Sequence, residues 1–88
     1  MRIIFSTKSW SEYLEFQTDD GRKLQRLNQL ILECTRHPFA GTGKPEPLKG
    51  NFKGWWSRRI DREHRLVYKI SGTGEAQALE IAQCRYHY

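Results

Sequence analysis

The chain is poor in cysteine and has neither a long apolar segment nor a full set of metal ligands. Its two cysteines, Cys34 and Cys84, are predicted to be buried, reduced thiols of a cytoplasmic protein rather than a disulfide. Cys34 and His37 have the spacing of a metal-binding pair, but no second pair completes a tetrahedral zinc site, so we expect no metal and no cofactor. No apolar run approaches the length of a membrane span, and Met1–Phe5 is too short for the apolar region of a signal peptide.

Linkers, internal repeats and low-complexity tracts are also absent, so residues 1–88 should form one domain with a single modest core. The formal net charge of +5 points to an anionic partner. Residues 44–69 hold eight basic and three acidic residues, so this segment alone carries an excess equal to that of the whole chain. A solvated basic surface would explain such a cluster. However, Trp55 and Trp56 lie among these cations, and basic residues interleaved with aromatics are typical of a nucleic-acid-binding surface.

The first half of the chain predicts one strand and two helices. Arg2–Phe5 is rich in β-branched and aromatic residues, as strands are. Ser9 and Glu12 match a capping box, which predicts a helix from this point to about Gln17. A second helix is predicted to end at His37, before a proline, and one stripe of its surface is apolar: Leu24, Leu27, Leu30, Ile31 and Cys34. This stripe should pack against a sheet.

The second half predicts a sheet. Residues 39–54 are rich in glycine and proline and should form a loop. Three strands are predicted after it, near residues 55–60, 64–70 and 76–86, with turns between them. A strand, two helices and then a run of antiparallel strands define an α+β domain with its helices on one face of the sheet.

Arg59 and Arg65 are candidate phosphate ligands. Strand alternation points Arg65 away from the core, and Arg59 projects the same way from the preceding strand, although Arg58 breaks the pattern there. Two guanidinium groups on one surface would bind a phosphate bidentately. Each arginine could instead form a surface ion pair with Asp61 or Glu63, and such a pair stabilises little.

Glu46 stands between Pro45 and Pro47, which restrict the backbone on both sides of its carboxylate. Lys44 and Lys49 nearby favour the ionised form. A structural salt bridge would explain an isolated glutamate. A rigid carboxylate beside arginines and a histidine also has the groups that RNA cleavage through the 2′-hydroxyl requires: a base, cations for the phosphorane and a proton donor for the departing 5′-oxygen.

The last residues of the chain combine a cation, two phenol rings and a histidine: Arg85, Tyr86, His87 and Tyr88. A lone histidine is usually structural, but its place between tyrosines at the end of the chain favours a catalytic role. His87 also shares the strand parity of Leu79 and Ile81, which would bury it unless a bulge or the end of the sheet intervenes. Periodicity therefore leaves the setting of His87 open.

Four motifs in order resemble the YoeB toxins of the RelE/ParE superfamily of bacterial toxin–antitoxin systems. They are Gly43-Lys44-Pro45-Glu46-Pro47-Leu48-Lys49, Trp56-Ser57-Arg58-Arg59-Ile60, Glu63-His64-Arg65-Leu66-Val67-Tyr68 and Cys84-Arg85-Tyr86-His87-Tyr88. The opening strand, Ser9-Trp10 and His37-Pro38-Phe39 also fit, so the likeness covers nearly the whole chain. The chain departs from the family mainly at Ser71–Glu75, where its loop looks longer than usual, and at Trp55.

The resemblance implies a microbial-ribonuclease-like, RelE-like fold and a cytoplasmic bacterial endoribonuclease that cuts mRNA in the ribosomal decoding site. By analogy with the family, Glu46 would be the general base, His87 the general acid and Arg65 the phosphate stabiliser. The terminal Tyr88 would complete the catalytic set. The remaining residues expected to contact the substrate are Lys44, Lys49, Arg59 and Tyr86.

The resemblance also implies partners: an antitoxin of the YefM/Phd type, operator DNA reached only through the antitoxin complex, and a second copy of the chain in a homodimer. Two alternatives stay open. A ParE-like gyrase poison would use the same fold without the nuclease residues, and Glu46 and His87 argue against it. A non-catalytic nucleic-acid-binding module would need the arginines but neither Glu46 nor the last two residues.

Overall fold

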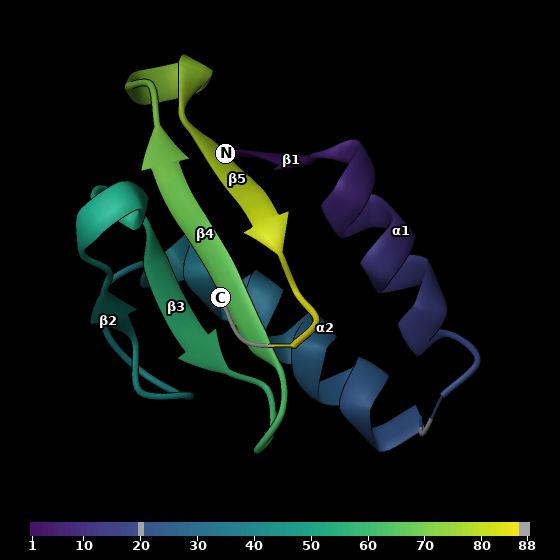
Figure 1. Ribbon diagram of the computed structural model, residues 1–88. Helices are drawn as coiled ribbons and strands as arrows, with labels where there is room; N and C mark the ends of the chain where they lie inside the picture. Colours follow the sequence, from purple (N-terminus) through teal and green to yellow (C-terminus); the bar gives the residue numbers. More distant parts are fainter. Residues whose placement is uncertain (20, 87–88) are drawn as a thin grey trace.

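The computed structural model describes residues 1–19 and 21–86 and shows an α+β domain (Figure 1). Strand β1 (Arg2–Phe5) leads into helix α1 (Thr7–Phe16) and helix α2 (Gly21–Arg36). The second half forms β2 (Glu46–Pro47), β3 (Trp56–Arg59), β4 (Arg65–Ser71) and β5 (Ala78–Gln83), with 3-10 turns at Gly50–Phe52 and Gly74–Ala76. The predicted order of strand, two helices and sheet is confirmed.

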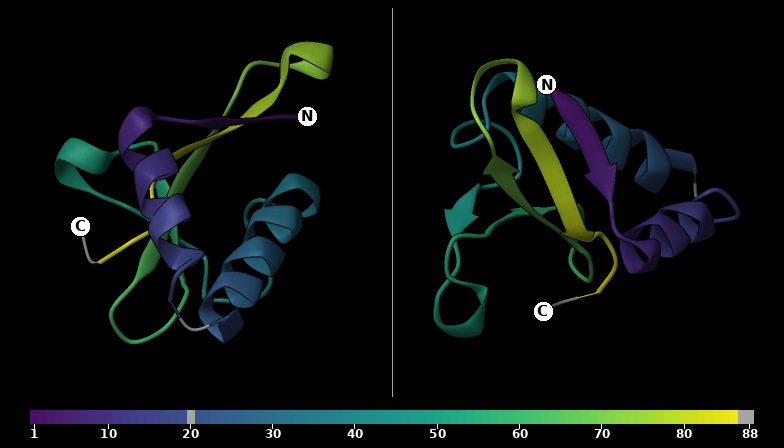
Figure 2. Two further views of the ribbon diagram at one scale, coloured as in Figure 1. Left: turned by 90° about the vertical axis from the view of Figure 1, so that its right-hand side faces the viewer. Right: turned by 90° about the horizontal axis from the view of Figure 1, so that it is seen from above.

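The five strands form one sheet in the order β1-β5-β4-β3-β2. The neighbours from β5 to β2 are antiparallel, as predicted, but β1 pairs with β5 in parallel. The first strand therefore lies beside the last strand in the sheet, so two segments from opposite ends of the sequence are neighbours (Figure 2). Local sequence patterns do not encode this pairing, because it joins residues about 76 positions apart.

One core lies between the sheet and the two helices. Helix α2 runs behind the sheet in Figure 1, and α1 lies along its β1–β5 side. The predicted apolar stripe of α2 is confirmed, with Leu24 packed at its margin and four residues fully in the core: Leu27, Leu30, Ile31 and Cys34. They meet Phe16 of α1 and the inner face of the sheet, which includes Leu66, Tyr68, Leu79 and Ile81. Within residues 1–19 and 21–86, neither helix has the length and apolarity to cross a bilayer.

The predicted capping box at Ser9 and Glu12 is wrong. Helix α1 begins earlier, and its N-cap is Ser6, whose extended backbone follows directly from β1 and whose Oγ accepts a hydrogen bond from the Ser9 N–H at 3.0 Å. Ser9 is instead fully buried and donates its hydroxyl to the carbonyl of Ile81 on β5 at 2.7 Å. The carboxylate of Glu12 accepts from the backbone N–H of Cys84 at 2.9 Å. Both side chains therefore tie α1 to the last part of the chain, in addition to their contacts with Ser6 and Lys8 at the start of the helix.

The loop predicted for residues 39–54 contains a fifth strand that the sequence pattern concealed. Glu46 and Pro47 of β2 pair with Ser57 and Trp56 of β3. Proline is tolerated in this pair because β2 is an edge strand, where one side of the backbone makes no ladder hydrogen bonds. The last strand is also shorter than predicted, since β5 ends at Gln83.

Arg58 is a core residue, which explains why it broke the expected alternation of β3. It faces inward with Trp56 and Ile60, and its side chain is fully buried. Its guanidinium donates to the backbone carbonyls of Thr42 at 3.2 Å and Ala40 at 2.9 Å, and also to that of His37. Further contacts are the Tyr68 hydroxyl at 3.2 Å and the Glu33 carboxylate at 3.5 Å. Arg58 thus fastens the segment between α2 and β2 onto the sheet.

Candidate active site

The register of the sheet places Glu46, Arg59 and Arg65 on the face away from the helices. Arg59 lies directly opposite Arg65, and Glu46 lies opposite Ser57. Directly paired residues share a face, and so do residues two apart on one strand. Ser57 and Arg59 are two apart, so Glu46 is offset from Arg59 by roughly 7 Å along the strand direction. The predicted convergence of one acid and two arginines on one surface therefore agrees with the backbone geometry.

The loop that carries Glu46 is bonded on both sides. The Gly43 carbonyl accepts from the Arg59 N–H at 2.7 Å, and the Leu48 N–H donates to the Trp55 carbonyl at 2.9 Å. Lys44 has a left-handed backbone with φ of 52°, which turns the chain into β2. The side chains of Lys44, Glu46 and Lys49 are exposed. The Glu46 carboxylate is therefore exposed to solvent on a backbone that is hydrogen-bonded on both sides, with Lys44 and Lys49 close to it in the sequence.

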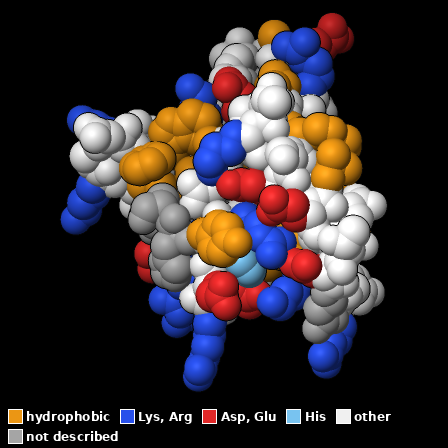
Figure 3. Space-filling view, turned by 45° about the vertical axis from the view of Figure 1, so that its right-hand side comes forward, with side chains coloured by type: hydrophobic (Ala, Val, Ile, Leu, Met, Phe, Trp, Pro, Cys, Tyr) orange, Lys and Arg blue, Asp and Glu red, His pale blue; other side chains and the backbone are white. Residues whose placement is uncertain are grey.

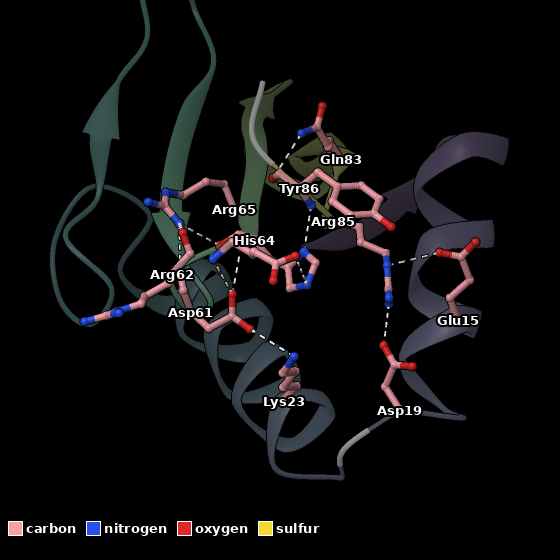
Figure 4. A network of polar contacts seen from close by, with 11 residues as sticks. Glu15, Asp19, Lys23, Asp61, Arg62, His64, Arg65, Gln83, Arg85 and Tyr86 are labelled. Carbon is pink, nitrogen blue, oxygen red and sulfur yellow. Dashed lines mark hydrogen bonds and ion pairs between the residues drawn. The ribbon is translucent and has the colours of Figure 1, made fainter.

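Arg65 is fixed at the turn between β3 and β4. Its Nη1 donates to the carbonyls of Asp61 at 2.7 Å and His64 at 3.0 Å (Figure 4). Among the described residues, the hydrogen bonds of this guanidinium all use Nη1. Arg65 does not form the alternative ion pair with Asp61. It bonds to the backbone carbonyl of Asp61, and the carboxylate of Asp61 lies 3.7 Å from the Lys23 ammonium.

A pocket of about 340 Å³ opens beside Arg65 and is rich in guanidinium groups. Its lining consists of Arg26, Arg59, Ile60, Asp61, Arg62 and Arg65. Arg26 comes from α2 and is held there by hydrogen bonds to the carbonyls of Ile60 at 3.2 Å and Arg59 at 3.1 Å. Four arginines against one aspartate favour a phosphate group as the occupant. Sequence reasoning missed Arg26 because helical periodicity marks it only as a polar position outside the apolar stripe.

Asp61 is the one acidic residue among the described residues that line this pocket, and its carboxylate stabilises the turn between β3 and β4. Burial opposes ionisation of the carboxyl, but hydrogen bonds from the backbone N–H groups of His64 and Glu63 and the nearby charge of Lys23 outweigh it. The net effect lowers the pKa of Asp61. The ionised carboxylate therefore organises the β3–β4 turn, whose carbonyls hold Arg65.

The tail after β5 is fastened next to Arg65. The N–H of Tyr86 donates to Nδ1 of His64 at 2.7 Å, and the carbonyl of Tyr86 accepts from the N–H of Arg65 at 3.1 Å (Figure 4). Arg85 pairs with Asp19 at 2.7 Å and Glu15 at 3.3 Å, and a space-filling view shows acidic and basic side chains gathered around a histidine on this side (Figure 3). The last residue of the tail that the structure describes is thus hydrogen-bonded to the candidate phosphate ligand. His87 and Tyr88, predicted as catalytic, lie outside the described residues.

The two tryptophans that suggested base stacking have partners within the chain. Trp56 packs against the core and contacts Phe39, with ring centroids 4.8 Å apart. The Lys69 ammonium lies 4.7 Å from the ring centroid of Trp55. Tyr86, by contrast, is 56% exposed, which fits its predicted substrate contact.

No three carboxylate, imidazole or thiol groups in the described parts of the chain are grouped to hold a metal ion.

The fold is that of the RelE-like toxins, in which a small mixed sheet is backed by two helices. Comparison with known proteins gives the family: the model of the YoeB-like toxins of bacterial type II toxin–antitoxin systems matches residues 5–88, and the chain belongs to this family. The curated Toxin YoeB of Escherichia coli K12 is 51% identical over the full length of both chains.

Solved structures agree with this assignment. A YoeB/ParE toxin from Agrobacterium tumefaciens superimposes with a TM-score of 0.95, at 51% identity and full coverage of both chains. The YoeB of Staphylococcus aureus is 39% identical and was solved as a dimer, with a TM-score of 0.87, and as a heterotetramer with YefM, with a TM-score of 0.86. In each case all of this chain and 98% of the other are covered.

Proposed function

We propose that this toxin is an endoribonuclease that cuts mRNA on the ribosome of a bacterial cell by general acid–base catalysis, without a cofactor. Glu46 takes the proton of the 2′-hydroxyl, and the 2′-oxygen attacks the adjacent phosphorus. Arg65 and Arg59 balance the charge on the phosphorane. His87 gives a proton to the 5′-oxygen as its bond to phosphorus breaks, which leaves a 2′,3′-cyclic phosphate and a free 5′-hydroxyl.

The observation that carries this proposal is the convergence of groups around Arg65. The sheet register puts a carboxylate and two guanidinium groups on one face, and the tail that leads to His87 is hydrogen-bonded at Tyr86 to the backbone of Arg65. Lys44 and Lys49 flank Glu46 and would bind neighbouring phosphates, and Tyr86 offers a ring to a base.

The test is cleavage of ribosome-bound message by matched variants. Glu46→Gln and deletion of His87-Tyr88 should each lower cleavage by about 10²-fold or more, while the affinity for ribosomes stays within a few-fold. Arg65→Ala should lose about 10²–10³-fold. Glu75→Gln is the control, because this exposed glutamate lies on the turn at Gly74–Ala76 and carries no assigned role.

The same assay separates the proposal from a non-catalytic binding module, which the arginine-lined pocket alone would support. If Glu46→Gln cuts message as fast as the parent protein, catalysis by this carboxylate is excluded. If the parent binds ribosomes and cuts nothing, the binding module remains.

We also propose that the toxin is neutralised by an antitoxin of the YefM/Phd type, forms a homodimer and reaches operator DNA only within the antitoxin complex. Support comes from the S. aureus relative, solved both as a dimer and with YefM. Co-expression with the antitoxin should restore growth and yield a stable complex, whereas the toxin alone should leave operator DNA unshifted in a gel.

A further inference from the structure

His64 is a buried histidine that hydrogen-bonds to the tail of the chain. Only 2% of it is exposed. Its ring lies edge-on to Phe16 of α1 with centroids 5.3 Å apart, and the ring centroid of Tyr86 is also 5.3 Å away (Figure 4 shows His64 and Tyr86). A backbone N–H can only donate, so the Nδ1 atom that accepts from Tyr86 must carry a lone pair. The proton of the neutral ring is therefore on Nε2, which faces the Glu63 carboxylate at 4.0 Å.

The tail needs such a contact because it has left the sheet. The pairing of β5 with β4 ends at Gln83 and Val67, beyond a register shift. Beyond this point, two backbone N–H groups donate to side chains and not to a neighbouring strand: that of Cys84 donates to Glu12, and that of Tyr86 donates to His64. Secondary structure no longer determines the path of the chain at this point.

Tyr86 also has a backbone conformation that L-residues avoid. Its φ is 62°, in the left-handed region. A non-glycine residue there is disfavoured by roughly 1–2 kcal/mol, so this turn persists only where other contacts hold it. The backbone hydrogen bonds of Tyr86, to His64 and from Arg65, are such contacts, and its carbonyl also accepts a longer bond from Gln83 Nε2 at 3.4 Å.

The backbone of His64 is itself fixed. Its N–H donates to the Asp61 carboxylate at 2.8 Å, and its carbonyl accepts from Arg65 Nη1 and from the Ile60 N–H at 3.0 Å each. The same turn therefore orients the imidazole toward the tail and the Arg65 guanidinium toward the pocket.

We propose that His64 is a positioning residue for the ribonuclease: its Nδ1 holds the Tyr86 amide and so fixes the backbone of Tyr86, which precedes the proposed general acid His87 in the sequence, beside Arg65. This inference rests on the proposed function, since it assumes that the tail delivers a catalytic group. It assigns His64 no contact with RNA.

The experiment compares three substitutions that differ in where they place an acceptor. In His64→Asn, the side-chain Oδ1 lies the same number of bonds from Cβ as Nδ1 does, so it can accept from Tyr86. In His64→Gln the acceptor lies one bond further out, and His64→Leu has none. His64→Asn should keep kcat within about 3-fold of the parent, whereas His64→Gln and His64→Leu should lose roughly 10–100-fold in kcat with little change in KM, because a misplacement of about 1 Å can cost 10²-fold.

A second measurement reads the contact without any catalysis. Hydrogen exchange of the Tyr86 amide, followed by NMR on the intact protein, should be slow in the parent and in His64→Asn and at least 10-fold faster in His64→Gln and His64→Leu. His37→Leu is the control, because His37 is exposed and its loss should alter neither exchange nor cleavage.

The inference is overturned if the Tyr86 amide of His64→Leu exchanges as slowly as that of the parent, or if it exchanges rapidly while cleavage continues at the parental rate. If His64→Leu does not fold, the comparison of His64→Gln with His64→Asn decides in the same way. A parent protein that cuts no RNA would refute the proposed function, and the exchange data would still decide whether His64 holds the tail.

Discussion

Replacing the buried Arg58 should destabilise the whole domain, and the structure gives the size of the effect. The guanidinium serves three backbone carbonyls, the Tyr68 hydroxyl and the Glu33 carboxylate, and its side chain is fully buried. A hydrogen bond to a charged group contributes about 1.5–3 kcal/mol, and each buried carbonyl left unpaired costs about 1–3 kcal/mol. These values are not additive, and removing one partner of a buried charge network typically costs about 3–5 kcal/mol. We expect that loss for Arg58→Met.

The expected loss is a large share of the total, because an 88-residue domain at 0.05–0.15 kcal/mol per residue unfolds with roughly 4–13 kcal/mol. Urea unfolding followed by far-UV circular dichroism measures it, and Arg58→Lys should lose nearly as much, since an ammonium cannot span the same acceptors. Arg59→Met on the same strand is the matched control. Arg59 is exposed, so its loss should change the unfolding free energy by less than about 0.5 kcal/mol. An Arg58→Met protein within 1 kcal/mol of the parent would refute the role assigned to this network.

Two further predictions concern titratable groups. The pKa of Asp61 is lowered in the folded state, so its carboxylate stabilises the fold above the unfolded pKa of about 3.9 and this contribution is lost as the pH falls through the folded pKa. Asp61→Asn should therefore be less stable than the parent at pH 6, and the difference in urea midpoint should vanish toward pH 2; a constant difference would contradict the sign. Burial raises the pKa of Cys34 to about 11 and that of Cys84 to about 12. Both thiols should resist a thiolate-selective disulfide reagent at pH 8 until urea unfolds the chain, and rapid labelling of the native protein would show that the core opens.

The sequence predicts those parts of the fold that follow from local periodicity. The apolar stripe of α2 and the inward positions Leu66 and Tyr68 of β4 could be read directly, because each helix or strand buries one face. The parallel pairing of β1 with β5 could not, since it depends on how the finished sheet closes. The inward position of Arg58 could not be predicted either. A charged side chain is stable in the core only when it has hydrogen-bond partners, and the partners of Arg58 are backbone carbonyls distant in the sequence.

The sequence was enough to select the acid and the two arginines of the candidate site, but not the residues that hold them in place. Glu46, Arg59 and Arg65 could be selected as an acid and two cations, and strand register explains why they share a face. Arg26 and His64 could not, because their roles come from contacts with segments 22 to 34 residues away along the chain. The roles predicted for Glu46, Arg65, His87 and Tyr88 remain predictions that the cleavage assay tests.

The parallel neighbours β1 and β5 have a consequence for biosynthesis. The ribosome makes β1 first and β5 last, so β1 has no partner until almost the entire chain has left the exit tunnel. Pairings this distant in sequence form late and slowly. The five-stranded sheet therefore cannot be completed before Ala78–Gln83 has been synthesised and has emerged from the ribosome, and β1 must wait for its neighbour in the sheet until then.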